Sequence, residues 1–161
     1  MKVCHTQIMK LIKELEEQKR LLIEKEDENS VVSYKEGEER LPSEYDYAQM
    51  RAQLRALDDR VRALRGVLAK ANCTVTVEPF GITVGEALVM LAQLQAEKVQ
   101  VESLAGRRQV SRRITPNGVV EYTECIYDVA GAGEDAKALR EKIGELQMAI
   151  DRANLTNYVE I

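Results

Sequence analysis

The sequence predicts a mainly α fold, an antiparallel four-helix bundle built from two helix–β arm–helix repeats. Three observations support this prediction: Leu, Ala, Glu, Lys, Arg and Gln dominate, four stretches show helical periodicity, and one helix-exit motif occurs twice. The chain has 161 residues, of which 45% are hydrophobic and 4% aromatic, and its formal net charge is −4. This composition fits one ordinary domain over 1–161 and argues against disorder or an aromatic-rich β-sandwich.

The first two predicted helices each carry one apolar seam. In the stretch 3–27, the residues that share a face are Ile8, Leu11 or Ile12, Leu15 and Leu22. The second stretch follows Pro42, and we expect Ser43 to cap it. Its seam is the clearest, because apolar residues alternate steps of three and four for more than three heptads. The seam comprises Tyr47, Met50, Leu54, Leu57, Val61, Leu64, Leu68 and Ala71.

The third and fourth predicted helices follow recognisable start signals. Thr83 and Glu86 form a capping-box pattern, in which each side chain satisfies a backbone N–H group of the other residue. The fourth helix is expected to begin after Gly131-Ala132-Gly133. Their seams are Val84, Ala87, Leu91, Leu94 and Val101, and then Leu139, Ile143, Leu146, Ile150 and Ala153. Four helices of similar length favour an antiparallel bundle.

The stretch 110–127 predicts a β hairpin that turns at Thr115-Pro116-Asn117-Gly118. In the register that this turn sets, Ile114 faces Val120, Arg113 faces Glu121 and Arg112 faces Tyr122. A lone hairpin is marginally stable, so we expect a strand near 30–36 to join it. The resulting small sheet would cap one end of the bundle.

The second and fourth helices end in the same way. Ala71-Asn72-Cys73-Thr74 matches Ala153-Asn154-Leu155-Thr156 at an offset of 82 residues, and the first and third helices align at an offset of 79. We interpret the chain as pseudo-repeats 1–78 and 79–161 that share one hydrophobic interior and send both β arms to the same end.

The sequence resembles the uncharacterised bacterial proteins often labelled septicolysin. The resemblance covers nearly the whole chain and rests on Glu86-Ala87-Leu88, on Ser111-Arg112-Arg113 and on the closing Ala153-Asn154-Leu155-Thr156. The first helix departs from the pattern, with Thr6-Gln7-Ile8 where relatives tend to carry Glu-Ala-Leu. The resemblance implies no activity and no functional residues, because the family has none established. The label suggests a cytolysin, but we expect no such activity without a secretion signal or a membrane-inserting segment.

Several classes of function are excluded by the residue inventory. His5 is the only histidine, which excludes di-iron bundles, zincins and histidine triads, and we expect Cys4-His5 to fray with the terminus. The three cysteines, Cys4, Cys73 and Cys125, are far apart in the sequence, so we expect three free thiols. We predict no metal and no cofactor. Without a signal peptide or a long apolar run, we expect a cytoplasmic protein with no membrane partner.

The leading hypothesis is a non-enzymatic protein that assembles with itself and whose β end binds a partner protein. A second apolar stripe on the third helix is the predicted self-association face, comprising Gly85, Val89, Ala92, Ala96 and Val99. Four arginines at the hairpin form the predicted partner surface: Arg107, Arg108, Arg112 and Arg113. In the simpler interpretation, acidic residues of the first arm (Glu36, Glu38 and Glu39) lie beside these arginines in the predicted sheet and neutralise them.

Two alternatives remain open. Lys19 and Lys98 interrupt their seams at equivalent places and, with Glu97 and Tyr47, would line a polar pocket for a small anion, as a binding site or an enzyme. In the simpler interpretation, both lysine stems lie on apolar surface with their ammonium groups in water. Nucleic-acid contact through the hairpin arginines ranks last, because the chain is acidic and lacks aromatic residues on which bases would stack.

Overall fold

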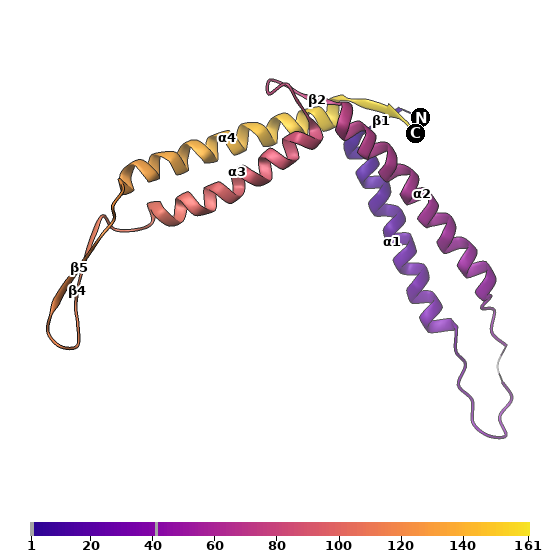
Figure 1. Cartoon of the computed structure of the whole chain (residues 1–161). Helices are drawn as coiled ribbons and strands as arrows, with labels where there is room; N and C mark the ends of the chain where they lie inside the picture. The colour runs from indigo at the N-terminus through magenta and orange to yellow at the C-terminus, as the bar shows by residue number, and fades with distance from the viewer. Residues whose placement is uncertain (1, 41) are drawn as a thin grey trace. The chain divides into compact units, whose positions relative to one another are not determined.

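The computed structural model describes residues 2–40 and 42–161 and has four helices in this part of the chain (Figure 1). They are α1 (His5–Asn29), α2 (Tyr47–Thr74), α3 (Val84–Ala105) and α4 (Val129–Thr156). Six short strands accompany them: β1 (Lys2–Cys4), β2 (Thr76–Val77), β3 (Ile82–Thr83), β4 (Val110–Ile114), β5 (Val120–Glu124) and β6 (Tyr158–Glu160). The strands form the antiparallel pairs β1–β6, β2–β3 and β4–β5. The predicted mainly α fold with small antiparallel β elements is confirmed.

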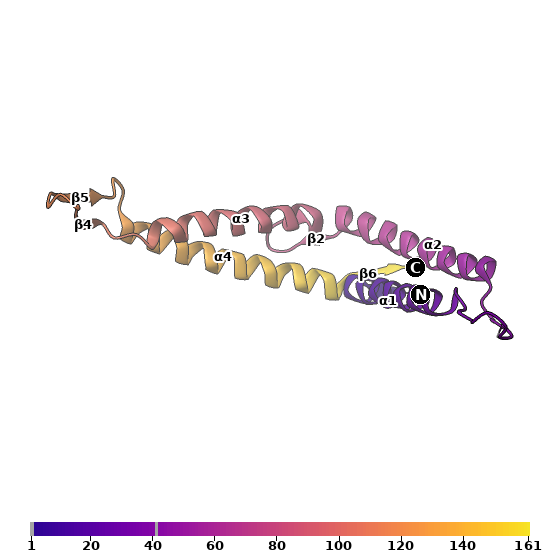
Figure 2. The ribbon, with the colours of Figure 1, turned by 90° about the horizontal axis from the view of Figure 1, so that it is seen from below.

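The chain divides into two compact units, and each contains one helix pair. The first unit comprises Met1–Thr74 and Asn154–Ile161, and the second comprises Val75–Ala153. Helices α1 and α2 lie side by side in the first unit, and α3 and α4 lie side by side in the second (Figures 1 and 2). Among the described residues, no helix combines the length and the apolar character needed to cross a bilayer.

Each unit has its own hydrophobic cluster, where the sequence analysis expected one shared interior. In the first unit, Val3, Ile8 and Ile12 are buried and pack against Leu64, Val67 and Leu68 of α2 and Val159 of β6. The cluster of the second unit contains residues of β2, α3 and α4: Val77, Val84, Ala87, Leu91, Leu94, Leu146, Ala149, Ile150 and Ala153. Most of these residues are the predicted seam positions, and they meet the seam of the other helix in the same unit.

The starts of two helices differ from the prediction. Helix α2 begins at Tyr47, because the Asp46 carboxylate accepts the Gln49 N–H group at 3.0 Å, whereas the Ser43 hydroxyl accepts that of Tyr45. Helix α4 begins at Val129, ahead of the two glycines, because the Asp128 carboxylate accepts the Ala130 N–H group at 3.0 Å. An aspartate directly before a helix satisfies the free donors of its first turn.

The predicted start of α3 is confirmed. The Thr83 hydroxyl accepts the Glu86 N–H group at 3.2 Å, and the Glu86 carboxylate accepts the Thr83 N–H group at 2.8 Å. These hydrogen bonds favour the ionised carboxylate and lower the pKa of Glu86.

The predicted hairpin register is also confirmed. Arg112 pairs with Tyr122, Arg113 with Glu121 and Ile114 with Val120. At the turn, Gly118 has a φ of 76° and donates its N–H group to the Thr115 carbonyl at 2.9 Å. This left-handed backbone conformation favours glycine.

The predicted strand near 30–36 is wrong. Residues 30–36 contain no strand, and β4 and β5 pair only with each other within the described chain, so the predicted capping sheet does not form. A turn follows instead, in which Glu38 donates its N–H group to the Lys35 carbonyl at 3.1 Å. The Lys35 N–H group, which a strand would use in its ladder, donates to the Glu38 carboxylate. This local hydrogen bonding competes with strand formation.

The short strand pairs of the two units use equivalent residues. Val3 pairs with Val159 in the first unit, and Ile82 pairs with Val77 in the second. Adding 79 to Val3 gives Ile82, and adding 82 to Val77 gives Val159. The Cys4 N–H group donates to the Gln7 side chain at 2.9 Å, as the Thr83 N–H group does to that of Glu86. The two helix pairs therefore begin with the same local structure.

The Cys4-His5 segment is ordered, contrary to the expectation that it frays. Cys4 is 6% exposed and His5 is 1% exposed, because β1 pairs with β6 and brings the C-terminal strand over this segment. Burial lowers the pKa of His5, and a hydrogen bond with the Asn157 backbone opposes part of the shift. Burial thus disfavours the charged imidazolium form of His5.

We predict that the first unit loses stability as the pH falls. The folded state binds a proton at His5 less readily than the unfolded chain does, so stability declines below the ordinary histidine pKa of about 6.5. The melting temperature, followed by circular dichroism, should fall more between about pH 7 and pH 5.5 for the wild type than for His5→Leu. Equal falls in the two proteins would contradict this role of His5.

Candidate interaction surfaces

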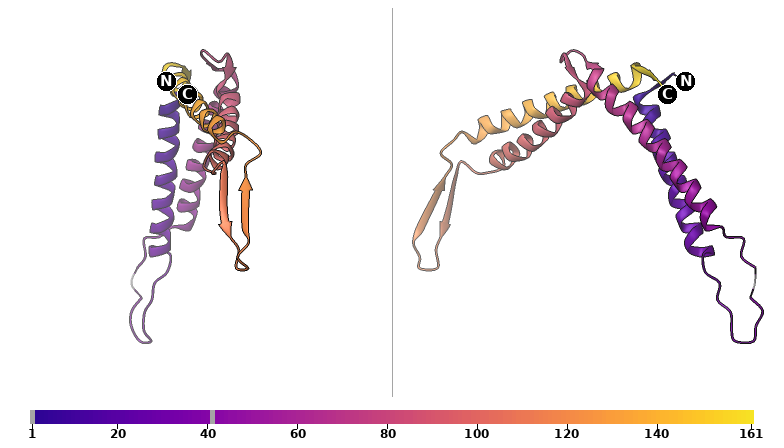
Figure 3. Two further views of the ribbon diagram at one scale, coloured as in Figure 1. Left: turned by 90° about the vertical axis from the view of Figure 1, so that its left-hand side faces the viewer. Right: turned by 45° about the vertical axis from the view of Figure 1, so that its right-hand side comes forward.

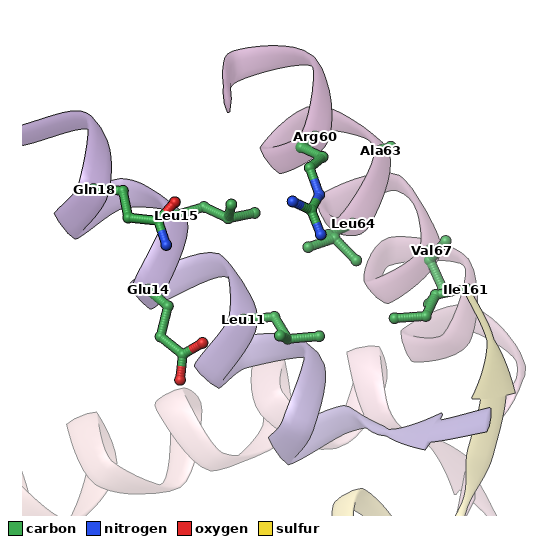
Figure 4. A pocket seen from close by; sticks show the side chains of 9 residues that line it. All are labelled: Leu11, Glu14, Leu15, Gln18, Arg60, Ala63, Leu64, Val67 and Ile161. Carbon is green, nitrogen blue, oxygen red and sulfur yellow. The ribbon is translucent and has the colours of Figure 1, made fainter. Parts of the chain in front are cut away.

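An open apolar groove runs between α1 and α2 in the first unit. One stretch of it has a volume of about 520 Å³. Figure 4 shows Leu11 and Leu15 of α1 pointing across the groove toward Leu64 of α2. Val67 and Ile161 line the end near the C-terminus, and the polar rim residues are Glu14, Gln18 and Arg60. The groove is an apolar channel with polar margins, which suits an apolar side chain or a helix better than a charged small molecule.

A second stretch lies farther along the same two helices. It has a volume of about 540 Å³ and shares Gln18 and Arg60 with the first stretch. Its apolar lining comprises Leu21, Leu22, Ala56 and Leu57. Leu21 is 51% exposed, although it belongs to a helix whose other face is buried. An α-helical hairpin buries only the seam between its helices, so apolar residues beside that seam stay open.

The predicted self-association face on α3 is open within the second unit. Val89 and Val99 are 59% and 64% exposed, Ala92 and Ala96 are exposed, and Gly85 is half-buried. The opposite side of α3 contributes the buried residues Val84, Ala87, Leu91 and Leu94. Helix α3 is therefore apolar on two sides and covered on one.

The base of the β4–β5 hairpin is fixed to the helices of the second unit. The Gln109 side-chain amide donates to the carbonyls of Cys125 and Tyr127 at 2.8 and 3.0 Å, and the Tyr127 hydroxyl donates to the Leu104 carbonyl of α3 at 2.9 Å. Beyond this base, the two strands extend past the ends of α3 and α4 as a ribbon (Figure 3). Every residue of β4 and β5 is exposed, including Tyr122 at 69%.

The four predicted partner-surface arginines lie at this hairpin and are all exposed. Arg113 pairs with Glu121 of the neighbouring strand at 2.6 Å. Arg107 and Arg108 line a depression of about 370 Å³ beside Cys125 and Tyr127. Burial of its hydroxyl raises the pKa of Tyr127, with a smaller contribution from Cys125. The hairpin thus presents cations next to exposed apolar side chains.

The residues of the predicted anion pocket are divided between the two units. Lys19 and Tyr47 belong to the first unit, and Glu97 and Lys98 belong to the second. Lys19 forms an ion pair with Asp58 of α2 at 2.6 Å, and Lys98 lies 4.0 Å from Glu102, which also accepts from Arg140 at 2.8 Å. Each lysine thus has a carboxylate partner in its own unit.

Tyr47 and Glu97 are solvent-facing. Tyr47 is 66% exposed, and its ring lies 5.5 Å from the Arg51 guanidinium carbon. Glu97 is exposed on α3. Over the described residues, no group of three or more His, Cys, Asp or Glu side chains is placed to hold a metal ion.

Sequence reasoning did not identify the α1–α2 groove. Leu21 carried the signal, since it makes the apolar stripe of α1 wider than its seam, whereas Leu11 and Leu57 were assigned to the seams and line the groove as well. That width indicates an additional contact face, but it does not say which part of the stripe another helix covers.

Comparison with known proteins supports the fold and gives no function. No protein-family description matches the chain, and no curated protein does. The chain is similar to a crystal structure of a conserved protein of unknown function from Corynebacterium diphtheriae, with a TM-score of 0.67 and 16% identity. The match covers 99% of this chain and 100% of the other. At this identity the likeness concerns the fold alone.

We predict that two groove leucines differ in their structural roles. Leu64 packs against the cluster of the first unit, so Leu64→Ala should lower the free energy of unfolding by about 2 kcal/mol. Leu21 is half exposed, so Leu21→Ala should change it by less than about 0.5 kcal/mol. Urea denaturation followed by circular dichroism measures both. A large loss for Leu21→Ala would mean that its side chain is buried in the folded protein.

Proposed function

We propose that this is a non-enzymatic, cytoplasmic protein that assembles with itself and whose hairpin end binds a protein partner. The observation that carries the proposal is the exposed area, 12,035 Å² for a chain of 18.2 kDa. A compact monomer of this mass exposes about 8,100 Å², and two independent compact halves would together expose about 9,800 Å². Even against the larger figure, the excess is about 2,200 Å² for one chain, and each partner in a stable interface buries about 800 Å².

The kind of side chain on this surface also supports self-association. Large apolar residues are exposed on α3 (Leu88, Val89 and Val99), on the hairpin (Ile114, Val120 and Tyr122) and along the groove of the first unit. Exposed apolar residues scattered singly are normal, whereas residues gathered on one face mark contact sites. The α3 face is the proposed contact between subunits, because small residues beside Val89 and Val99 permit close approach of a second helix.

Two finer proposals follow from the sequence. The equivalent strand pairs and helix starts at offsets of 79 and 82 support an internal duplication. Membership of the bacterial family labelled septicolysin remains a proposal that rests on the motifs quoted above.

The two alternative functions receive less support. An anion-binding or enzymatic pocket needs Lys19 and Lys98 without carboxylate partners, and both have one. Nucleic-acid contact needs free cations, and one of the four hairpin arginines, Arg113, is paired with Glu121.

We predict that the wild-type protein is a dimer or larger oligomer at high micromolar concentration, as measured by sedimentation velocity. The double variant Val89→Lys/Val99→Lys should weaken the association by about tenfold or more, because it places charges where apolar surface is buried. Val31→Lys is a matched control, since Val31 is 72% exposed and lies outside α3.

A monomeric wild type would contradict the proposed self-association. Equal effects of the double variant and of Val31→Lys would exclude the α3 face as the contact.

A further inference from the structure

The β4–β5 hairpin is a two-stranded sheet with two open edges. Within the described chain, neither strand pairs with a strand other than its hairpin partner. Val110, Ile114 and Tyr122, which share one face of the ribbon, are 51%, 65% and 69% exposed. A two-stranded hairpin is marginal in water and gains stability from a third strand, and an open edge is a template for one.

The register shows which backbone groups an added strand would meet. At the two ends of the hairpin, Thr115 donates its N–H group to the Val119 carbonyl and Cys125 donates its N–H group to the Gln109 carbonyl, both at 2.9 Å. Hydrogen-bonded and non-hydrogen-bonded pairs alternate along an antiparallel ladder. The opposed residues Arg112 and Tyr122 are therefore a non-hydrogen-bonded pair. Arg112 turns its N–H and C=O groups outward at the β4 edge, and Tyr122 turns its own outward at the β5 edge.

The two edges differ in what a second copy would find there. A two-fold pairing of β4 about Arg112 places two guanidinium groups opposite each other, which is destabilising. A two-fold pairing of β5 about Tyr122 places two tyrosine rings together and Val120 opposite Glu124. The remaining charge of β5, Glu121, is already paired with Arg113 at 2.6 Å. Of the two registers centred on the Arg112–Tyr122 level of the hairpin, the β5 register is the one without directly opposed like charges.

We propose that the partner of the hairpin is the hairpin of a second copy of this chain, joined edge to edge through β5. The product is a four-stranded antiparallel sheet with Tyr122 opposite Tyr122 at its centre. The pairs Tyr122–Tyr122 and Val120–Glu124 exchange main-chain hydrogen bonds. The ribbon faces that carry Val110, Ile114, Val120 and Tyr122, together with Arg112 and Glu124, become one continuous face. This inference rests on the proposed self-association and names one surface that carries it.

Proline substitution tests the edge directly. Tyr122→Pro removes the outward N–H group at the centre of the β5 edge without removing a hydrogen bond inside the hairpin. Arg112→Pro is the matched control, because it makes the same change at the β4 edge. Tyr122→Thr removes the ring and keeps the N–H group. Sedimentation velocity on the full-length variants gives the dissociation constants, and circular dichroism checks that the helices are retained.

We expect Tyr122→Pro to weaken self-association by about tenfold or more, and Arg112→Pro to leave it unchanged or strengthen it. Tyr122→Thr should weaken it less than Tyr122→Pro does. Equal weakening by both prolines, or by neither, would overturn the β5 pairing while leaving self-association intact. A monomeric wild type would overturn both proposals.

A crosslink provides a positive test that does not depend on loss of binding. Two hydrogen-bonded residues opposite each other across an antiparallel pair have Cα atoms about 5.5 Å apart, within the range of a disulfide. In a Cys73→Ser/Cys125→Ser background, Tyr122→Cys should form a disulfide-linked dimer under oxidation, and Arg112→Cys should not. Equal crosslinking of the two variants would contradict the proposed pairing.

Discussion

Each unit depends on a short antiparallel strand pair beside the first turn of its leading helix. In one unit, Val3 and Val159 hold the strand before α1 against the strand that follows α4. In the other unit, Ile82 and Val77 hold the strand before α3 against the strand that follows α2. The buried members of these pairs, Val3 and Val77, also belong to the hydrophobic cluster of their unit. Each leading helix therefore begins beside a paired strand, and the hydrophobic cluster of the unit extends from the helices onto that strand pair. A helix pair without this closure would have only a narrow seam to hold it together.

The small size of each cluster explains why so much of the molecule remains exposed. Two helices side by side bury one stripe from each, and the remaining apolar residues have no third or fourth helix in the same unit to cover them. Leu21 and Val89 are examples, since each lies on an amphipathic helix and is more than half exposed. Natural helical proteins cover such residues by adding helices or by associating. For this chain the second solution is the one that we propose.

The sequence predicted the parts of the fold that follow from periodicity and strong turn signals. The seams apart from Tyr47, the capping box at Thr83 and the hairpin register were predicted correctly, because burial, a hydroxyl–carboxylate pair and a Pro-Asn-Gly turn each leave an unambiguous pattern. The starts of α2 and α4 were misplaced, since Asp46 and Asp128 compete with more conspicuous Ser and Gly signals nearby. The prediction of a strand near 30–36 failed because the β propensity of Val31-Val32 is outweighed by a local turn, in which the Lys35 N–H group donates to the Glu38 carboxylate. The open groove needed coordinates, because a pattern shows that a stripe is apolar and not what covers it.

The antiparallel pairing of β1 with β6 brings the two ends of the chain together, with Lys2 opposite Glu160. A short linker between them would therefore close the backbone into a ring without displacing either strand. New ends opened at Gly37, in a tight turn outside the helices, would then give a rearranged chain that keeps the four helices and three strand pairs of the described residues. We therefore expect the same fold to form when the helices are synthesised in a different order.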